Sequence, residues 1–70
     1  MGWFEKQRQD YIRAQLHAFG QIRRAAIAEQ FEVTIQVASA DIQKFIVSHP
    51  NSIIYDGRAK MYVLDKEAIQ

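Results

Sequence analysis

The sequence predicts a small, mainly α-helical domain that ends in a two-stranded β-hairpin (α+β). Apolar residues recur at three- and four-residue intervals over most of the chain, as on the buried face of a helix. Two short runs rich in β-branched and aromatic residues follow, on either side of Asp56-Gly57, a strong turn signal. The chain has 70 residues and neither a repeat nor a Pro/Gly-rich linker, so we expect one domain over 1–70.

The first helix is predicted over roughly residues 4 to 18, and Gly20 is expected to end it. Its buried stripe has one polar member, Arg8. The apolar members of the stripe are Phe4, Tyr11, Ile12, Leu16 and Phe19. Such spacing is typical of a helix with one face against a core.

A short extended stretch, 21–23, leads into a second helix over 24–31, in which Ile27 and Phe31 share one face. This helix has only about two turns. Glu32 follows it, at a position where the backbone is often left-handed.

Thr34 is a good N-cap for a third helix over about 35–48, which His49 and Pro50 should end. The inward stripe of this helix is expected to consist of Ala38, Ile42, Phe45 and Ile46. Only about three residues separate the second and third helices, and a hairpin over 53–64 follows. This order of elements is that of a winged helix-turn-helix, in which the third helix enters the major groove and the hairpin is the wing.

Two polar or aromatic contacts within the fold can also be predicted. Asp41 lies about 60° from the centre of the inward stripe, so we expect it to pair with Arg8 or Arg13 and not to contact bases. Tyr55 and Tyr62 should face each other across the hairpin and pack on the core.

The face of the third helix opposite Ala38 carries amides, a hydroxyl and small apolar groups, with a single charge. A face meant only for water would be richer in Glu, Lys and Arg. Gln bonds adenine bidentately, Ser bonds several bases, and Ala or Val touches a thymine methyl, so major-groove edges suit this face. The predicted DNA contacts on this helix and its cap are Thr34, Gln36, Val37, Ser39, Ala40, Gln43 and Lys44.

Basic side chains beside this helix are expected to contact phosphates. They are Arg23 and Arg24 near the start of the second helix, and Arg58 and Lys60 on the hairpin. The formal net charge is only +1, but acidic residues such as Glu5 and Asp10 lie toward a terminus, so the charge is unevenly distributed.

The segment "IAEQFEVTIQVASADIQKF" resembles the helix-turn-helix of DeoR-type winged-helix repressors, and "YDGRAKMYV" resembles the hairpin that follows it. Nearly the whole chain is similar to the N-terminal DNA-binding domain of bacterial WYL-domain regulators, the type that controls phage-defence genes. The matching positions are Trp3, Arg8, "ASADI" at 38–42, Tyr55, Asp56, Lys60, Tyr62 and Val63. The resemblance implies a bacterial or phage transcriptional regulator, repressor-like, that is either free-standing or excised from a longer chain.

Composition excludes several other classes. The chain has no cysteine, no run of about 18 apolar residues and no signal-peptide pattern, so we expect a cytoplasmic protein without disulfides or a membrane span. It has no Gly-rich phosphate loop and no set of nucleophile, base and orienting group, so we expect neither an enzyme nor a cofactor. His17 and His49 are too far apart in sequence, without suitable neighbours, to predict a metal site.

The predicted partner is double-stranded DNA, bound by two copies, because one module of this size buries little surface. Trp3 and Phe4 are candidate contacts of a homodimer. The alternative is a protein-interaction winged helix that docks Val37, Ala40 and Val47 on another protein.

Overall fold

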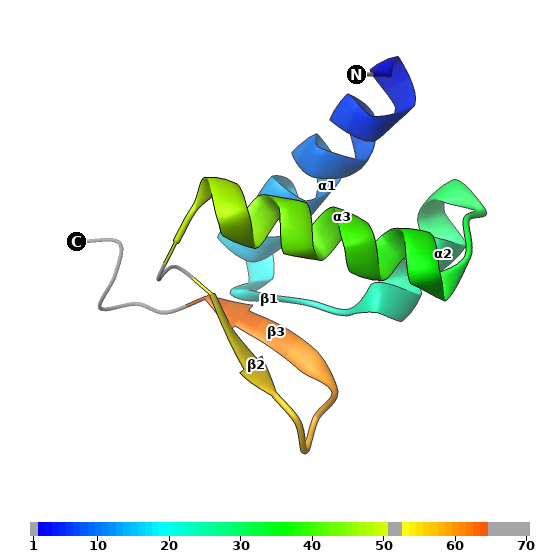
Figure 1. Cartoon of the computed structure of the whole chain (residues 1–70). Helices are drawn as coiled ribbons and strands as arrows, with labels where there is room; N and C mark the ends of the chain where they lie inside the picture. Colours follow the sequence, from blue (N-terminus) through cyan, green and yellow to red (C-terminus); the bar gives the residue numbers. More distant parts are fainter. Residues whose placement is uncertain (1, 51–52, 65–70) are drawn as a thin grey trace.

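The computed structural model describes residues 2–50 and 53–64, which form three helices and a small antiparallel sheet (Figure 1). The elements in chain order are α1 (Trp3–Phe19), β1 (Gln21–Ile22), α2 (Arg24–Phe31), α3 (Ile35–Ser48), β2 (Ile53–Asp56) and β3 (Met61–Leu64). The predicted class, three helices followed by a hairpin, is confirmed, and the helices begin and end within a residue or two of their expected positions.

The sheet has one strand more than the predicted two-stranded wing. β1 pairs with β3, which gives the order β1-β3-β2, with Gln21 opposite Val63 and Ile22 opposite Tyr62. The Leu64 amide also donates to the Gly20 carbonyl at 2.9 Å. A strand of two residues is too short to show an alternating pattern, so the sequence indicated only an extended stretch there. Because of this pairing, the base of the wing is fixed to the link between α1 and α2.

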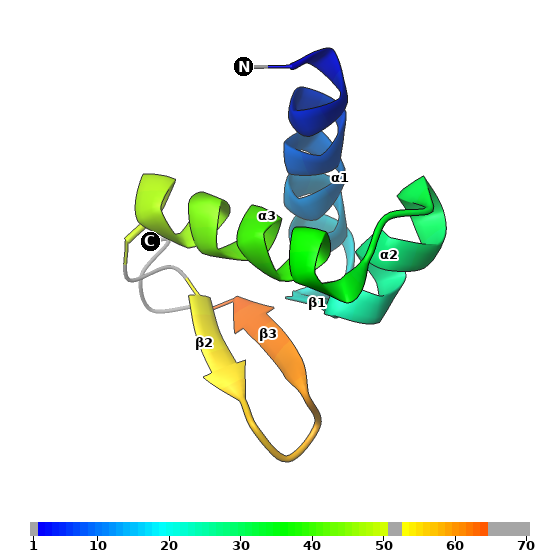
Figure 2. The same ribbon diagram turned by 45° about the vertical axis from the view of Figure 1, so that its right-hand side comes forward.

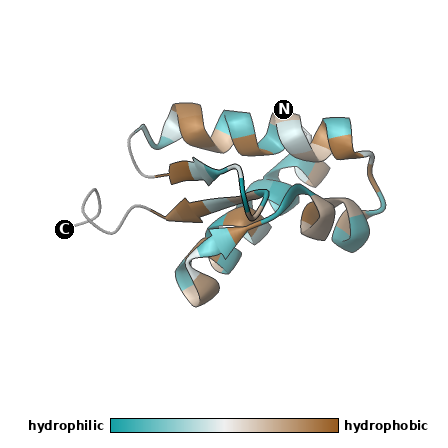
Figure 3. Cartoon of the chain, turned by 90° about the horizontal axis from the view of Figure 1, so that it is seen from below, coloured by the Kyte–Doolittle hydropathy of each residue, from teal (hydrophilic) through white to brown (hydrophobic). Residues whose placement is uncertain are grey.

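The core lies where the three helices meet, and the inner face of the sheet closes it. Its buried side chains are Ile12, Leu16, Ile22, Ile27, Ala38, Ile42, Phe45 and Tyr62. The predicted inward stripe of α3 is thereby confirmed, and Ile46 packs against the same cluster. Hydrophilic and hydrophobic residues alternate along the helices, as expected of elements with one buried and one exposed face (Figure 3).

The predicted stripe of α1 is correct in its middle and wrong at both ends. Ile12 and Leu16 are buried, whereas Phe4 is 72% exposed and Phe19 is also exposed. The first turns of α1 project beyond α2 and α3, so Phe4 has no neighbouring helix to cover it (Figure 2). Helical spacing shows which residues share a face, but it does not show how far along that face the neighbouring elements reach.

The helix ends follow their predicted chemistry. Gly20 has φ 72° and its amide donates to the Leu16 carbonyl, which closes α1. Thr34 caps α3, because its Oγ1 accepts a hydrogen bond of 3.2 Å from the Val37 amide. Glu32 ends α2 with φ 54° and ψ 45°, the left-handed backbone expected at this position.

Glu32→Gly is therefore expected to raise the melting temperature. A non-glycine residue in the left-handed region costs on the order of 1 kcal/mol, which in a domain of this size corresponds to about 4–8 °C. Thermal unfolding followed by circular dichroism measures the change. Gln30→Gly, two residues earlier and inside α2, is the control and should lower the melting temperature, because glycine destabilises a helix. A melting temperature of Glu32→Gly at or below that of the parent chain would show that the backbone of Glu32 is not strained.

Candidate nucleic-acid interface

The outward face of α3 is open to solvent. Gln36, Ala40 and Gln43 are exposed along it, Ser39 is half-buried at its edge, and Val47 is 79% exposed at its far end. Neither Gln36 nor Gln43 uses its side-chain amide in a hydrogen bond with another described residue. Both amides are consequently available to an external partner such as a base edge.

Thr34 and Val37 stand at the start of this face and are tied to each other. The Thr34 hydroxyl accepts from the Val37 amide, so its lone pair serves the helix cap, while its proton remains available for donation. Val37 is exposed just beside the cap. A DNA contact by either residue stays a prediction.

Three of the predicted phosphate contacts meet around one hollow. Arg23 and Arg24 from the start of α2 and Lys60 from the wing line it, together with Ala25, Ile35 and Ala59. No acidic side chain contributes to its wall. Ile35 is the first residue of α3, so the basic hollow directly adjoins the outward face that begins at Gln36.

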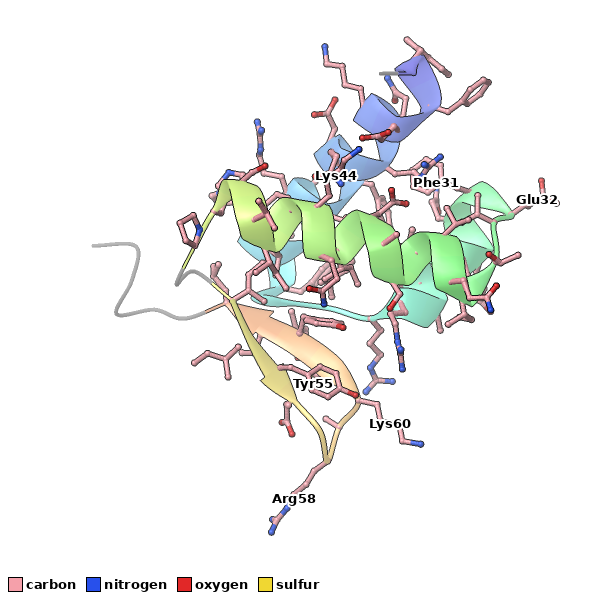
Figure 4. All side chains as sticks on the ribbon, viewed as in Figure 1. Phe31, Glu32, Lys44, Tyr55, Arg58 and Lys60 are labelled. Atoms are coloured by element: carbon pink, nitrogen blue, oxygen red, sulfur yellow. The ribbon has the colours of Figure 1, made fainter. Side chains whose placement is uncertain are left out.

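The wing turn is fixed by Asp56. Its Oδ1 accepts from the backbone amides of Arg58, at 3.0 Å, and Ala59, at 3.3 Å. Lys60 follows with φ 55°. Its side chain extends from the side of the wing, whereas Arg58 lies at the tip of the wing, farther from the helices, and points away from them (Figure 4). Asp56 thus holds the turn that presents both cations.

The two tyrosines pair across the hairpin as predicted. Tyr55 lies opposite Tyr62 in the register of β2 and β3, with ring centroids 4.9 Å apart. Tyr62 is buried in the core, while Tyr55 is about half exposed and covers it. This pair links the wing to the helices.

Lys44 is less available than the sequence suggested. Its Nζ donates to Oε1 of Glu5, on the first turn of α1. This hydrogen bond lowers the pKa of the Glu5 carboxyl below its usual value, because it favours the charged form of the carboxyl. The two residues are 39 positions apart, and no local pattern in the sequence indicates their contact. A phosphate that approaches Lys44 would have to compete with Glu5.

Glu5→Gln is expected to release Lys44 and to strengthen binding to any DNA. One additional phosphate contact should make the salt dependence of the binding constant steeper by about one unit. Fluorescence anisotropy with random-sequence duplexes at several salt concentrations measures this slope. Asp10→Asn is the matched control, because it removes the same charge from an exposed site on α1. Equal effects of the two substitutions would mean that only the net charge matters and that Glu5 does not restrain Lys44.

Asp41 pairs with Arg8, one of the two arginines predicted for it. Arg8 Nε donates to Asp41 Oδ2, and Arg8 Nη2 donates to Asp41 Oδ1 at 3.3 Å. Gln9, which the sequence did not single out, donates its side-chain amide to the Asp41 carbonyl at 2.8 Å. Arg13 is exposed. Asp41 is therefore a structural contact between α1 and α3 and is turned away from the outward face.

Residues 2–50 and 53–64 offer neither a metal site nor a membrane-spanning helix. No group of three or more His, Asp or Glu side chains there could hold a metal ion. No helix in this part of the chain is long and apolar enough to cross a membrane.

These features define a winged helix-turn-helix: a short link joins α2 to an exposed α3, and a hairpin lies beside α3 (Figures 1 and 2). The family model for the winged helix-turn-helix domain of BrxR transcriptional regulators matches residues 5–69, and the chain belongs to this family. A comparison with curated proteins gave no match. The family places the domain among transcriptional regulators, as the resemblance implied, while the relation to DeoR-type and WYL-domain regulators stays a prediction.

Proposed function

We propose that this domain binds double-stranded DNA sequence-specifically, with α3 in the major groove, and that it regulates transcription by occupying an operator as a repressor does. The observation that carries the proposal is the position of the outward face of α3 beside the basic hollow of Arg23, Arg24 and Lys60. Groups that suit base edges thus adjoin groups that suit phosphates. The proposed function involves neither catalysis nor a cofactor.

Gln36 and Gln43 are the proposed base-reading residues. They are two helical turns apart, or about 10 Å along α3, which corresponds to about three base pairs of B-DNA. Ala40 lies between them and, as a small residue, allows the helix to approach the bases closely. The expected recognition sequence therefore has two preferred positions separated by about three base pairs.

The residues proposed to contact DNA phosphates lie mainly on the wing side of α3. Arg23, Arg24, Arg58 and Lys60 belong to α2 and the wing. Lys44, paired with Glu5, is the cation of α3 itself and lies toward α1 (Figure 4). The strand of DNA that passes the wing is thus expected to receive most of the phosphate contacts.

A selection from random duplex DNA, sequenced after enrichment, tests this function. Enrichment of one motif, together with affinity that falls steeply with salt, is the expected result. The absence of an enriched motif and a flat salt dependence would contradict it. The second candidate function is a protein-docking winged helix, which the exposure of Val37 and Val47 favours. Such a module would enrich no motif and would show a flat salt dependence.

We further propose that two copies bind together through the tip of α1. Trp3 and Phe4 are 65% and 72% exposed there, and their rings form an edge-to-face pair with centroids 5.0 Å apart. The tip projects away from the wing, so a contact there would leave the basic hollow of each copy open (Figure 1).

Trp3→Ala is expected to lower affinity for a probe with two half-sites and to leave affinity for a single half-site nearly unchanged. The physical reason is that only the linkage between the two copies is lost. Gel-shift titrations of both probes measure the difference. Equal weakening on both probes would show that Trp3 supports the fold of each domain and does not join two copies.

A further inference from the structure

Two neighbouring residues of α1 hold one residue of α3 by both its side chain and its backbone. Arg8 contacts both carboxylate oxygens of Asp41, and the Gln9 amide donates to the Asp41 carbonyl at 2.8 Å. The Arg8 and Asp41 side chains are only 16% and 6% exposed. We call this arrangement of Arg8, Gln9 and Asp41 the α1–α3 clamp.

The clamp fixes the rotation and position of α3, which the apolar contacts of this helix do not fix. Ala38, Ile42 and Phe45 bury their side chains against α1, α2 and the sheet, but hydrophobic burial is non-directional. A small rotation or slide of α3 would preserve most of that burial. The same movement would break the clamp, because a two-point contact of guanidinium with carboxylate requires a defined geometry.

The orientation of α3 matters because its opposite face holds the proposed base-reading residues. Asp41 is flanked by the exposed Ala40 and lies two residues before the exposed Gln43. A rotation of α3 by 20° would move a side-chain tip on a helix of about 6 Å radius by roughly 2 Å. Hydrogen bonds to base edges tolerate much less displacement than this.

We propose that Arg8 and Gln9 are positioning residues for sequence recognition, which set the rotation of α3 through Asp41 and so determine base preference without contacting DNA. The inference rests on the proposed function, because it assumes that α3 reads bases. Glu5 and Lys44 also join α1 to α3, but the Lys44 side chain is 56% exposed and solvent weakens that pair.

The test replaces the ion pair by an apolar pair in the double variant Arg8→Met/Asp41→Leu. Such an exchange preserves net charge and is often neutral or favourable for stability. The melting temperature, the affinity for random DNA and the salt slope should stay close to those of the parent chain. The preference for the selected site over random DNA should fall about ten-fold, the size of one lost base contact.

A second variant tests the role of Arg8 in base preference if the double variant does not fold. Arg8→Lys preserves the charge but not the planar two-point contact, so the preference should again fall, by about three-fold or more. Arg13→Lys is the matched control, because it makes the same change at an exposed position of α1 and should leave the preference unchanged.

Three outcomes would contradict either the positioning role of the clamp or the proposed function. A folded double variant with the full preference would overturn the inference, since α3 would then keep its orientation without the Arg8–Asp41 ion pair. Equal losses on selected and random DNA would also overturn it, because the clamp would then act on general binding. A parent chain without any preference would refute the proposed function itself, and this result appears before any variant is compared.

Discussion

Arg8→Met alone is expected to lower the free energy of unfolding by about 3–5 kcal/mol, the usual effect of removing one partner of a buried ion pair. The substitution leaves the Asp41 carboxylate, only 6% exposed, without the guanidinium that compensates its burial. A 70-residue domain has a total stability of roughly 4–10 kcal/mol, so a large part of it would be lost. The variant should be partly unfolded at room temperature or close to it.

Urea unfolding followed by circular dichroism measures this effect as a lower midpoint with an unchanged slope. Arg13→Met is the control, since this exposed arginine on the same helix should change stability by no more than about 0.5 kcal/mol. Adding Asp41→Leu to Arg8→Met should restore most of the loss, because no unpaired charge then remains. Similar midpoints for the Arg8 and Arg13 variants would show that the clamp contributes little to stability.

The Arg8 and Asp41 pair also shows which long-range contacts can be predicted from sequence. Each residue is a charged group beside an otherwise apolar helical stripe, and a charge in such a place needs a partner. A contact of Asp41 with Arg8 or Arg13 could thus be predicted although 33 positions separate Asp41 from Arg8, and the structure shows that Arg8 is the partner. Lys44 and Glu5 lie on solvated faces, where a charge has no need of a partner, so nothing in the sequence indicates that they meet.

The helix boundaries could be predicted because local chemistry determines them. Gly20 and Thr34 act through the backbone of their own turns, so their effects are visible in a short window of sequence. The pairing of β1 with β3 and the exposure of Phe4 and Phe19 depend on which elements lie nearby in three dimensions. The grouping of Arg23, Arg24 and Lys60 depends on the same placement of the wing, which only the structure supplies.

Replacing base-reading residues and replacing phosphate-holding residues should have opposite signatures. Gln36→Ala or Gln43→Ala is expected to cost roughly 1–3 kcal/mol on the selected site and to relax the preference at one base pair. The salt slope should barely change, because neither side chain carries a charge. Binding measured on the selected site, on single-base variants of it and on random DNA distinguishes these effects.

Arg58→Ala or Lys60→Ala is expected to weaken selected and random DNA alike and to reduce the salt slope by about one unit for each lost phosphate contact. Lys60 lines the basic hollow, whereas Arg58 lies at the wing tip, so the two variants also show which part of the wing meets the DNA backbone. Base preference should be unchanged in both variants, since phosphate contacts and base contacts are made by different residues. If the wing variants bound DNA as well as the parent while Val37 or Val47 substitutions abolished binding to a protein partner, the domain would be a protein-docking module.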